Sequence, residues 1–269
     1  MKLKNMASII LLSMLLQPVL AENPKVDLQK LPLDGRKSAF SEALSRQSSS
    51  GHALEPIRPE LTRQEIARRG EQSTGIILRK SADSAGMGTA FFIAKGIAVT
   101  NQHVVAHDGT YTLRMKTGDF KVKDYPVKIL GSDKAGDVAV LKVEGAESIP
   151  ALPLANPYSP PKVMDDVFIV SNPKGLEYTS VMGQISAFRM KAQLDQAPAT
   201  EVLSSLKDNW DCIQYTAPID NGSSGGAVLN NRGEVIGVNY AKGTSGQLAN
   251  YASSVKNLRK LLSTLGIKM

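Results

Sequence analysis

The sequence predicts an all-β protein, folded as two β-barrels or as a β-sandwich, and three observations lead to this prediction. Short strand-like segments recur at even spacing, with turns of Gly and polar residues between them. A Pro-rich passage over residues 149–162 divides these segments into two groups. The chain has 22 Gly and 14 Pro but one Trp and six Phe, a composition typical of a loop-rich fold with short elements.

The first group of strands follows a predicted helix. That helix covers residues 61–71, where Thr62 can cap the first turn and Glu65 stands three residues later, as in a capping box. After it, the pattern changes to short strands. The predicted strands of this group are 75–79, 89–93, 97–100, 111–115, 119–129 and 138–143.

The second group ends in a helix. Residues 190–208 interrupt this group and are predicted to form a surface loop with a short helix at 201–206. The C-terminal helix covers 254–265 and has Val255, Leu258, Leu261 and Leu262 on one face. The predicted strands are 166–170, 179–186, 212–215, 227–229, 235–240 and 248–252.

The N-terminus has the form of a secretory signal over residues 1–21, with a basic start, an apolar stretch, Pro18 and small residues up to Ala21. The apolar stretch is short for a membrane span, so an uncleaved anchor is the less favoured alternative. We expect an exported protein, periplasmic or extracellular, with no stable membrane insertion after signal removal. After this signal we expect four regions: a polar extension or pro-segment over 22–70, the first β-domain over 71–148, the linker over 149–162 and the second β-domain over 163–269.

Charge and cysteine content exclude several classes of function. The formal net charge is +7, but no dense Lys/Arg block with aromatic residues occurs, so a solvated basic surface is favoured over nucleic-acid or membrane binding. A single cysteine, Cys212, excludes an internal disulfide and every multi-cysteine zinc motif. It lies in a predicted strand and is expected to be a buried small hydrophobe.

A histidine base has three candidates: His52, His103 and His107. His103 follows an apolar strand that runs into a polar turn, whereas His52 lies in a Ser-rich stretch. His103 and His107 are four residues apart, as in a metal pair on a helix. The zincin pattern needs Glu directly after the first His, and Val104 stands there, so we expect no metal site.

A serine nucleophile is suggested by residues 221–227, which read NGSSGGA. The glycines permit a tight turn whose N–H groups converge on one point, as an activated Ser224 requires. The alternative is an ordinary Gly/Ser loop.

The carboxylate candidate is Asp137, which directly precedes an apolar strand. At a barrel edge it could accept a hydrogen bond from an imidazole N–H and fix its tautomer. Asp133 and Asp108 are alternatives, although each is more typical of a turn residue.

In chain order, these three segments resemble the trypsin-like serine proteases and most closely the HtrA/Deg branch. The resemblance is carried by VTNQHVV, GDVAVLKV and NGSSGGAVLNNRGEVIGVN, and by SNPKGLEYTSVMGQISAF between linker and nucleophile. It runs from about Gly75 to Leu262 and implies two six-stranded antiparallel barrels with the site between them, and no cofactor. It also implies His103 as general base, Asp137 as its orienting partner, and Ser224 as nucleophile. The backbone N–H groups of Gly222, Ser223 and Ser224 would form the oxyanion hole.

Three departures from the family bear on its regulation. Ser223 stands where the branch usually has Asn and digestive members have Asp, so the zymogen switch that uses this Asp is not expected. The chain ends at Met269, so we expect no PDZ domain. Residues 190–208 are long where the family has regulatory loops, which suggests a gate over the cleft.

Specificity is less well defined. Digestive relatives that select Arg or Lys carry an acid six residues before the serine, and Pro218 stands there in this chain, so basic selection is not expected. Asp220, Asn239 and Tyr240 are the other predicted pocket residues. The resemblance suggests small aliphatic residues before the scissile bond.

The function predicted from these features is a secreted or periplasmic serine endopeptidase that acts on protein or peptide substrates, including unfolded ones. The resemblance suggests a homotrimer. The alternative from another class is a protease-fold chaperone or binding protein with little turnover.

Overall fold

The computed structural model describes residues 58–118, 121–157, 159–176, 178–190, 211–242 and 250–269. The predicted signal peptide, residues 22–57 of the predicted extension with His52, and the predicted loop helix at 201–206 lie outside the described residues. So do residues 191–208 of the predicted gate.

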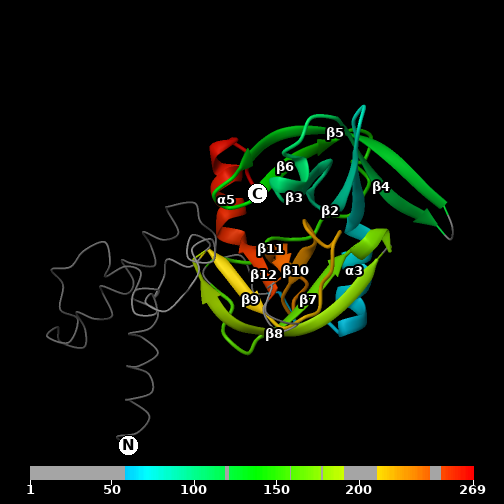
Figure 1. The fold of residues 1–269 in the computed structure, drawn as a ribbon. Helices are drawn as coiled ribbons and strands as arrows, with labels where there is room; N and C mark the ends of the chain where they lie inside the picture. Colours follow the sequence, from blue (N-terminus) through cyan, green and yellow to red (C-terminus); the bar gives the residue numbers. More distant parts are fainter. Residues whose placement is uncertain (1–57, 119–120, 158, 177, 191–210, 243–249) are drawn as a thin grey trace, which may run out of the picture. The chain divides into compact units, whose positions relative to one another are not determined.

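The first six strands form one closed antiparallel barrel, drawn in cyan to green in Figure 1. Neighbouring strands follow the order β1-β2-β3-β6-β5-β4. The strands β4 and β5 form a hairpin that extends beyond the barrel, and Arg114 faces Asp124 across it. The strand bounds are β1 Thr74–Lys80, β2 Ala85–Ala94, β3 Ile97–Thr100, β4 Thr110–Gly118, β5 Lys121–Asp133 and β6 Val138–Val143.

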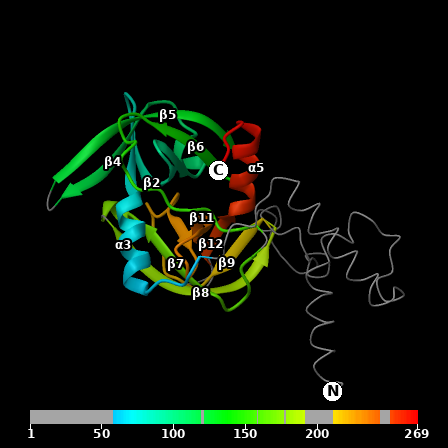
Figure 2. The same cartoon turned by 180° about the vertical axis from the view of Figure 1, so that it is seen from behind.

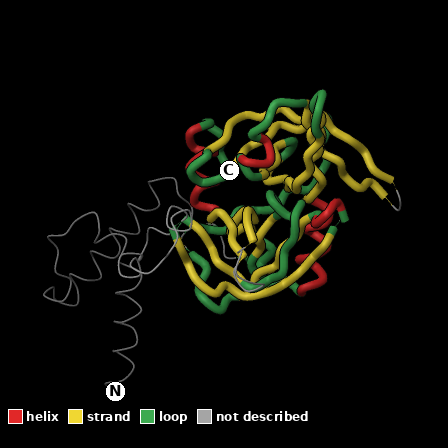
Figure 3. Tube along the Cα trace, viewed as in Figure 1, coloured by secondary structure: helices red, strands yellow, loops and turns green. Residues whose placement is uncertain are grey.

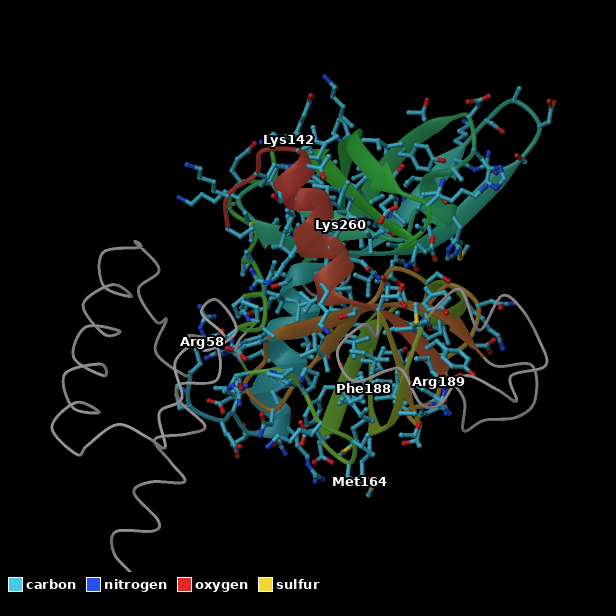
Figure 4. All side chains as sticks on the ribbon, turned by 90° about the vertical axis from the view of Figure 1, so that its left-hand side faces the viewer. Arg58, Lys142, Met164, Phe188, Arg189 and Lys260 are labelled. Carbon is cyan, nitrogen blue, oxygen red and sulfur yellow. The ribbon has the colours of Figure 1, made fainter. Side chains whose placement is uncertain are left out.

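The last six strands form a second closed barrel, in the order β10-β11-β12-β9-β8-β7. All-β architecture with two six-stranded barrels is therefore confirmed, and the strands dominate the trace in Figure 3. Figure 4 shows Phe188 and Arg189 at the end of β8. The strand bounds are β7 Asp166–Ser171, β8 Thr179–Arg189, β9 Cys212–Tyr215, β10 Ala227–Leu229, β11 Val235–Lys242 and β12 Asn250–Ser254.

Each barrel is filled by side chains that alternate inward along its strands. In β4, for example, Tyr111, Leu113 and Met115 are buried while the residues between them are not. In the second barrel, the phenol of Tyr215 is buried within a cluster of apolar side chains.

Each of two helices packs on the barrel that is farther away in the chain. Helix α3 (Arg63–Ser73) precedes β1 and also packs on β7 and β8. Helix α5 (Val255–Thr264) follows β12 and also packs on β5 and β6 of the first barrel. Figures 1 and 2 show the two helices on opposite sides of the barrels.

The predicted capping box of α3 is present. The Glu65 N–H donates to Thr62 Oγ1 at 3.2 Å, and the Thr62 N–H donates to Glu65 Oε2 at 2.9 Å. The Thr62 N–H and the Thr62 hydroxyl both donate to Glu65 Oε2, and these two bonds to the carboxylate hold the pKa of Glu65 below its usual range. The helix therefore begins at Arg63, and the capping box satisfies two of the four N–H groups that lack an intrahelical partner, those of Thr62 and Glu65.

A third apolar cluster joins the two barrels. It combines Phe91 of β2, Val140 of β6 and Val170 of β7 with Ile66 of α3 and Leu258 of α5. All five are buried. The two barrels thus share a core, which fixes residues of one barrel against residues of the other.

Candidate active site

His103 begins a short 3₁₀ helix, η2 (His103–Val105), soon after β3. The imidazole is half exposed, and its Nδ1 lies 2.9 Å from Asp137 Oδ2. An ionised carboxylate can only accept, so Nδ1 is the donor of this pair, and a neutral imidazole in this arrangement has Nε2 as its acceptor. A neutral histidine in this tautomer is equipped to take a proton from a hydroxyl.

Asp137 lies in the turn between β5 and β6 and is 6% exposed. Its φ of +50° is in the left-handed region, and its carbonyl accepts from Asn101 Nδ2 at 2.8 Å. Its Oδ1 accepts from the His103 N–H at 3.0 Å, so both carboxylate oxygens bind the same histidine. This pairing fixes the ring relative to the backbone of η2.

Asp133 and Asp108, the two alternative carboxylates for the histidine, lie elsewhere or make other hydrogen bonds. Asp133 accepts from the N–H groups of Ala135 and Gly136 at 3.1 and 3.2 Å, which caps the turn before Asp137. Asp108 is exposed, as is His107, whose carbonyl accepts from the Tyr111 hydroxyl at 2.6 Å. Neither Asp133 nor Asp108 is hydrogen-bonded to His103 in the described part of the chain.

Ser224 lies in the turn between β9 and β10, and this turn is pressed against the first barrel. Gly222 and Gly225 adopt φ values of +92° and +85°, which L side chains rarely adopt. A Cβ on Gly225 would lie 2.0 Å from the Thr89 carbonyl oxygen of β2. Glycine is therefore required for the close approach of the two barrels here.

Donors from distant parts of the chain hold the carbonyl groups of this nucleophile turn. Thr89 and Lys174 lie far from the turn in the chain and were not predicted from the sequence, whereas Asn239 was predicted only as a pocket residue. The acceptor and donor pairs are Asn221 O with Lys174 N (2.7 Å), Gly222 O with Thr89 Oγ1 (2.8 Å), Ser223 O with Asn239 Nδ2 (2.8 Å) and Ser224 O with Thr89 N (2.8 Å).

Two N–H groups of the turn, those of Gly222 and Ser224, have no acceptor among the described residues. In a trans peptide the C=O and N–H point in opposite directions, so a bound carbonyl aims the next N–H the other way. Two free donors beside a serine hydroxyl fit an oxyanion hole. The predicted third donor is corrected, because the Ser223 N–H donates to the Asp220 carbonyl at 3.0 Å and closes the turn.

The Ser224 hydroxyl donates to the Tyr240 carbonyl at 3.4 Å. Within the described residues, no hydrogen bond joins it to His103. Transfer of its proton to the imidazole therefore requires the hydroxyl to leave the Tyr240 carbonyl. Hydrogen bonds between a nucleophile and its base are often long or absent without substrate and form only when substrate is bound.

Asn239, one of the four predicted pocket residues, is placed differently by the structure. It is 1% exposed, and its amide bonds Tyr215 and Ser223 behind the turn, so it offers no surface to a substrate. Pro218 is exposed, and Asp220 and Tyr240 are partly buried.

Asp220 makes an ion pair with Lys174, whose Nζ lies 2.7 Å from Asp220 Oδ2. The hydrogen bond to Asp220 raises the pKa of Lys174. This ion pair joins the nucleophile turn to η3 (Pro173–Gly175).

Cys212 is buried in β9, with its Sγ 3.7 Å from the Tyr240 hydroxyl. The described residues contain no group of three His, Cys, Asp or Glu that could hold a metal ion. None of the described helices is long and apolar enough to cross a membrane.

Comparison with known proteins identifies the family. A family model described as a trypsin-like peptidase domain matches residues 88–238. Among curated relatives, the mitochondrial serine protease HTRA2 of Bos taurus is 34% identical over 178 residues, or 65% of this chain and 35% of the relative. The periplasmic serine endoprotease DegP of Salmonella typhimurium is 30% identical over 156 residues, or 58% of this chain and 30% of the relative. The chain thus spans about a third of the length of these relatives.

Solved structures agree in fold. The serine endoprotease from Yersinia pestis superposes with a TM-score of 0.62 at 24% identity, covering 77% of this chain and 67% of that one. An HtrA-type protease, AlgW, with a tripeptide gives 0.60 at 25% identity, covering 77% and 64%. Since the family model matches more than half of the chain, this chain belongs to the trypsin-like peptidase family, with HtrA-type serine proteases among its relatives.

Proposed function

We propose that this chain is a serine endopeptidase with Ser224 as nucleophile, His103 as general base and Asp137 as the orienting carboxylate. The observation that carries the proposal is the pairing of His103 with a buried carboxylate whose two oxygens bind the ring and the backbone of that residue. Few structural roles require a half-exposed imidazole to be held in one tautomer. A base with its Nε2 available is what a serine nucleophile requires.

The reaction would proceed through an acyl-enzyme. Ser224 Oγ bonds to the scissile carbonyl carbon while His103 Nε2 takes the hydroxyl proton, and the resulting oxyanion accepts from the N–H groups of Gly222 and Ser224. The C–N bond then breaks, and His103 gives the proton to the leaving amine. Water repeats the sequence on the acyl group and releases Ser224.

A fluorophosphonate probe tests this proposal, because it reacts with activated serines. We expect it to label the purified protein and neither the Ser224→Ala nor the His103→Ala variant. Absence of labelling in a folded wild-type protein would contradict the proposal. A chaperone-like binding protein would instead hold unfolded casein without cleaving it.

For substrates, we propose unfolded protein chains cleaved after small aliphatic residues such as Val or Ala. Pro218 stands where basic specificity would need an acid, and Asp220 is already paired with Lys174. Sequencing the new termini in a casein digest would measure the preference. Predominant cleavage after Arg or Lys would overturn it.

We propose export to the periplasm or the medium, followed by assembly into a homotrimer. The export proposal is supported by the form of residues 1–21 and by relatives named as periplasmic endoproteases, although a mitochondrial relative also matches. Cell fractionation with N-terminal sequencing tests the first point, and light scattering of the purified protein tests the second.

A further inference from the structure

The buried phenol of Tyr215 is the unusual feature of the second barrel. Tyr215 is 0% exposed, and the other buried side chains of its core cluster are Ala, Val and Ile residues. A buried hydroxyl is costly unless it has a hydrogen-bond partner. Its partner is Asn239 Oδ1, which accepts from the phenol.

This bond connects two strands that are not neighbours. Tyr215 of β9 pairs with Asn250, and Asn239 of β11 pairs with Ala252, so β12 lies between them. The phenol therefore reaches across one strand to bind the amide. The backbone hydrogen bonds join each of these strands to β12 and not to each other, so the Tyr215–Asn239 bond is a direct side-chain link between β9 and β11.

The phenol fixes which way the Asn239 amide faces. Because the hydroxyl donates to Oδ1, the Nδ2 group is directed at the Ser223 carbonyl, which can only accept. The Asn239 backbone adds two bonds to the turn, since its N–H donates to Gly226 O at 2.9 Å and its carbonyl accepts from Gly225 N at 2.8 Å. All four hydrogen-bonding groups of Asn239 are thus engaged.

The Ser223 carbonyl belongs to the peptide that carries the Ser224 N–H. We propose that Tyr215 and Asn239 are positioning residues that orient this peptide, and thereby aim the Ser224 N–H at the oxyanion. This inference rests on the proposed function and adds to it a hydrogen-bonded relay from the barrel core to the oxyanion hole. Burial raises the pKa of Tyr215 well above its usual range, so its hydroxyl keeps its proton at the pH values where such enzymes are assayed.

Two substitutions test the relay from its two ends. Tyr215→Phe removes only the hydroxyl, and we expect the rate of fluorophosphonate labelling and kcat on an unfolded casein substrate to fall about tenfold. Asn239→Asp places a carboxylate oxygen against the Ser223 carbonyl, and a fall of about a hundredfold is expected. KM should stay within about twofold in both, because the relay acts on the transition state.

The matched control is Tyr125→Phe, which makes the same change at a buried tyrosine of the first barrel. It should leave labelling and kcat unchanged. A structural readout accompanies the kinetics: the backbone amide resonance of Ser224 should shift in Tyr215→Phe and stay in place in Tyr125→Phe.

The outcomes separate the two proposals. Labelling of Tyr215→Phe at the wild-type rate would overturn the relay and leave the proposed function standing. If the wild type is not labelled, the proposed function fails, and the Ser224 resonance alone decides the relay. Failure of both relay variants to fold would mark the pair as purely structural and overturn the inference.

Discussion

The two barrels supply the candidate site in different ways. The first barrel presents side chains, His103 and Asp137, that bind each other directly over short distances. The second presents one hydroxyl and a set of main-chain groups, which are held by donors from both barrels. The chemistry of the first barrel therefore depends on residue identity, whereas that of the second depends on backbone direction.

The largest effect is expected where identity matters most. Asp137→Asn replaces an acceptor with an amide and favours the wrong tautomer of His103, so kcat should fall about 10⁴-fold with the fold intact. Steady-state kinetics on unfolded casein, with circular dichroism as a check of folding, measure this. A loss below about tenfold would mean that the carboxylate does not set the tautomer.

The next largest effect is expected when the nucleophile turn of the second barrel loses its contact with Thr89, which lies in β2 of the first barrel. Its buried hydroxyl donates to Gly222 O and accepts from the Asn172 N–H at 3.0 Å. Thr89→Val keeps the shape and removes both bonds, so we expect unfolding to become easier by about 1–3 kcal/mol. Because the Gly222 carbonyl loses its donor, kcat should also fall, by about tenfold.

Thr74→Val is the matched control for Thr89→Val. The Thr74 hydroxyl is buried and has no partner among the described residues. The same chemical change there should leave kcat alone and stabilise the protein by up to about 1 kcal/mol. Equal loss of activity in both valine variants would contradict the prediction that the Thr89 hydroxyl supports kcat through its bond to the Gly222 carbonyl.

A substitution of Lys174 tests whether the nucleophile turn depends on the main chain or on the side chain of this residue. Its N–H holds the Asn221 carbonyl, while its exposed ammonium pairs with Asp220. Lys174→Ala keeps the N–H, so kcat/KM should change by less than about threefold, and the difference should vanish in about 0.5 M salt. A large loss that persists in salt would show that the ion pair orders the turn.

The smallest effect is expected far from the site, at the β4–β5 hairpin. Arg114 donates to both carboxylate oxygens of Asp124 at 2.7 and 2.8 Å, and this bidentate bond lowers the pKa of Asp124. Both side chains are about two-fifths exposed, so Asp124→Asn should cost less than about 1 kcal/mol. Because the folded-state pKa is depressed, this stabilisation is present above pH about 4 and is lost as the pH falls through the folded-state value. Thermal unfolding of both proteins from pH 7 to 3 measures it, and a difference that grows toward pH 3 would contradict this assignment.

The elements that the sequence predicted well are the local ones. Every predicted strand and both helices outside the undescribed regions are present, because short apolar runs, Gly turns and the Thr62–Glu65 cap are all encoded within a few residues. The motifs also predicted Asp137 as the partner of His103; the structure shows a contact of 2.9 Å between their side chains, and their catalytic roles stay a prediction.

The contacts that sequence reasoning missed are long-range. Thr89 and Gly222 are 133 positions apart, and neither residue type signals the other. Asn239 was predicted to line the pocket, but it is buried, and its amide binds the Tyr215 phenol and the Ser223 carbonyl. The use of the Ser223 N–H by Asp220 likewise depends on turn geometry rather than on residue type.

The position of Cys212 gives the protein a built-in reporter of its own opening. It is the sole cysteine, it is buried, and it lies in the same short strand as Tyr215. A thiol reagent can reach it only when β9 separates from its neighbours, so the rate of modification measures local opening of that strand. The rate at which β9 opens can thus be compared with the rate of turnover in the wild-type protein, without an introduced cysteine.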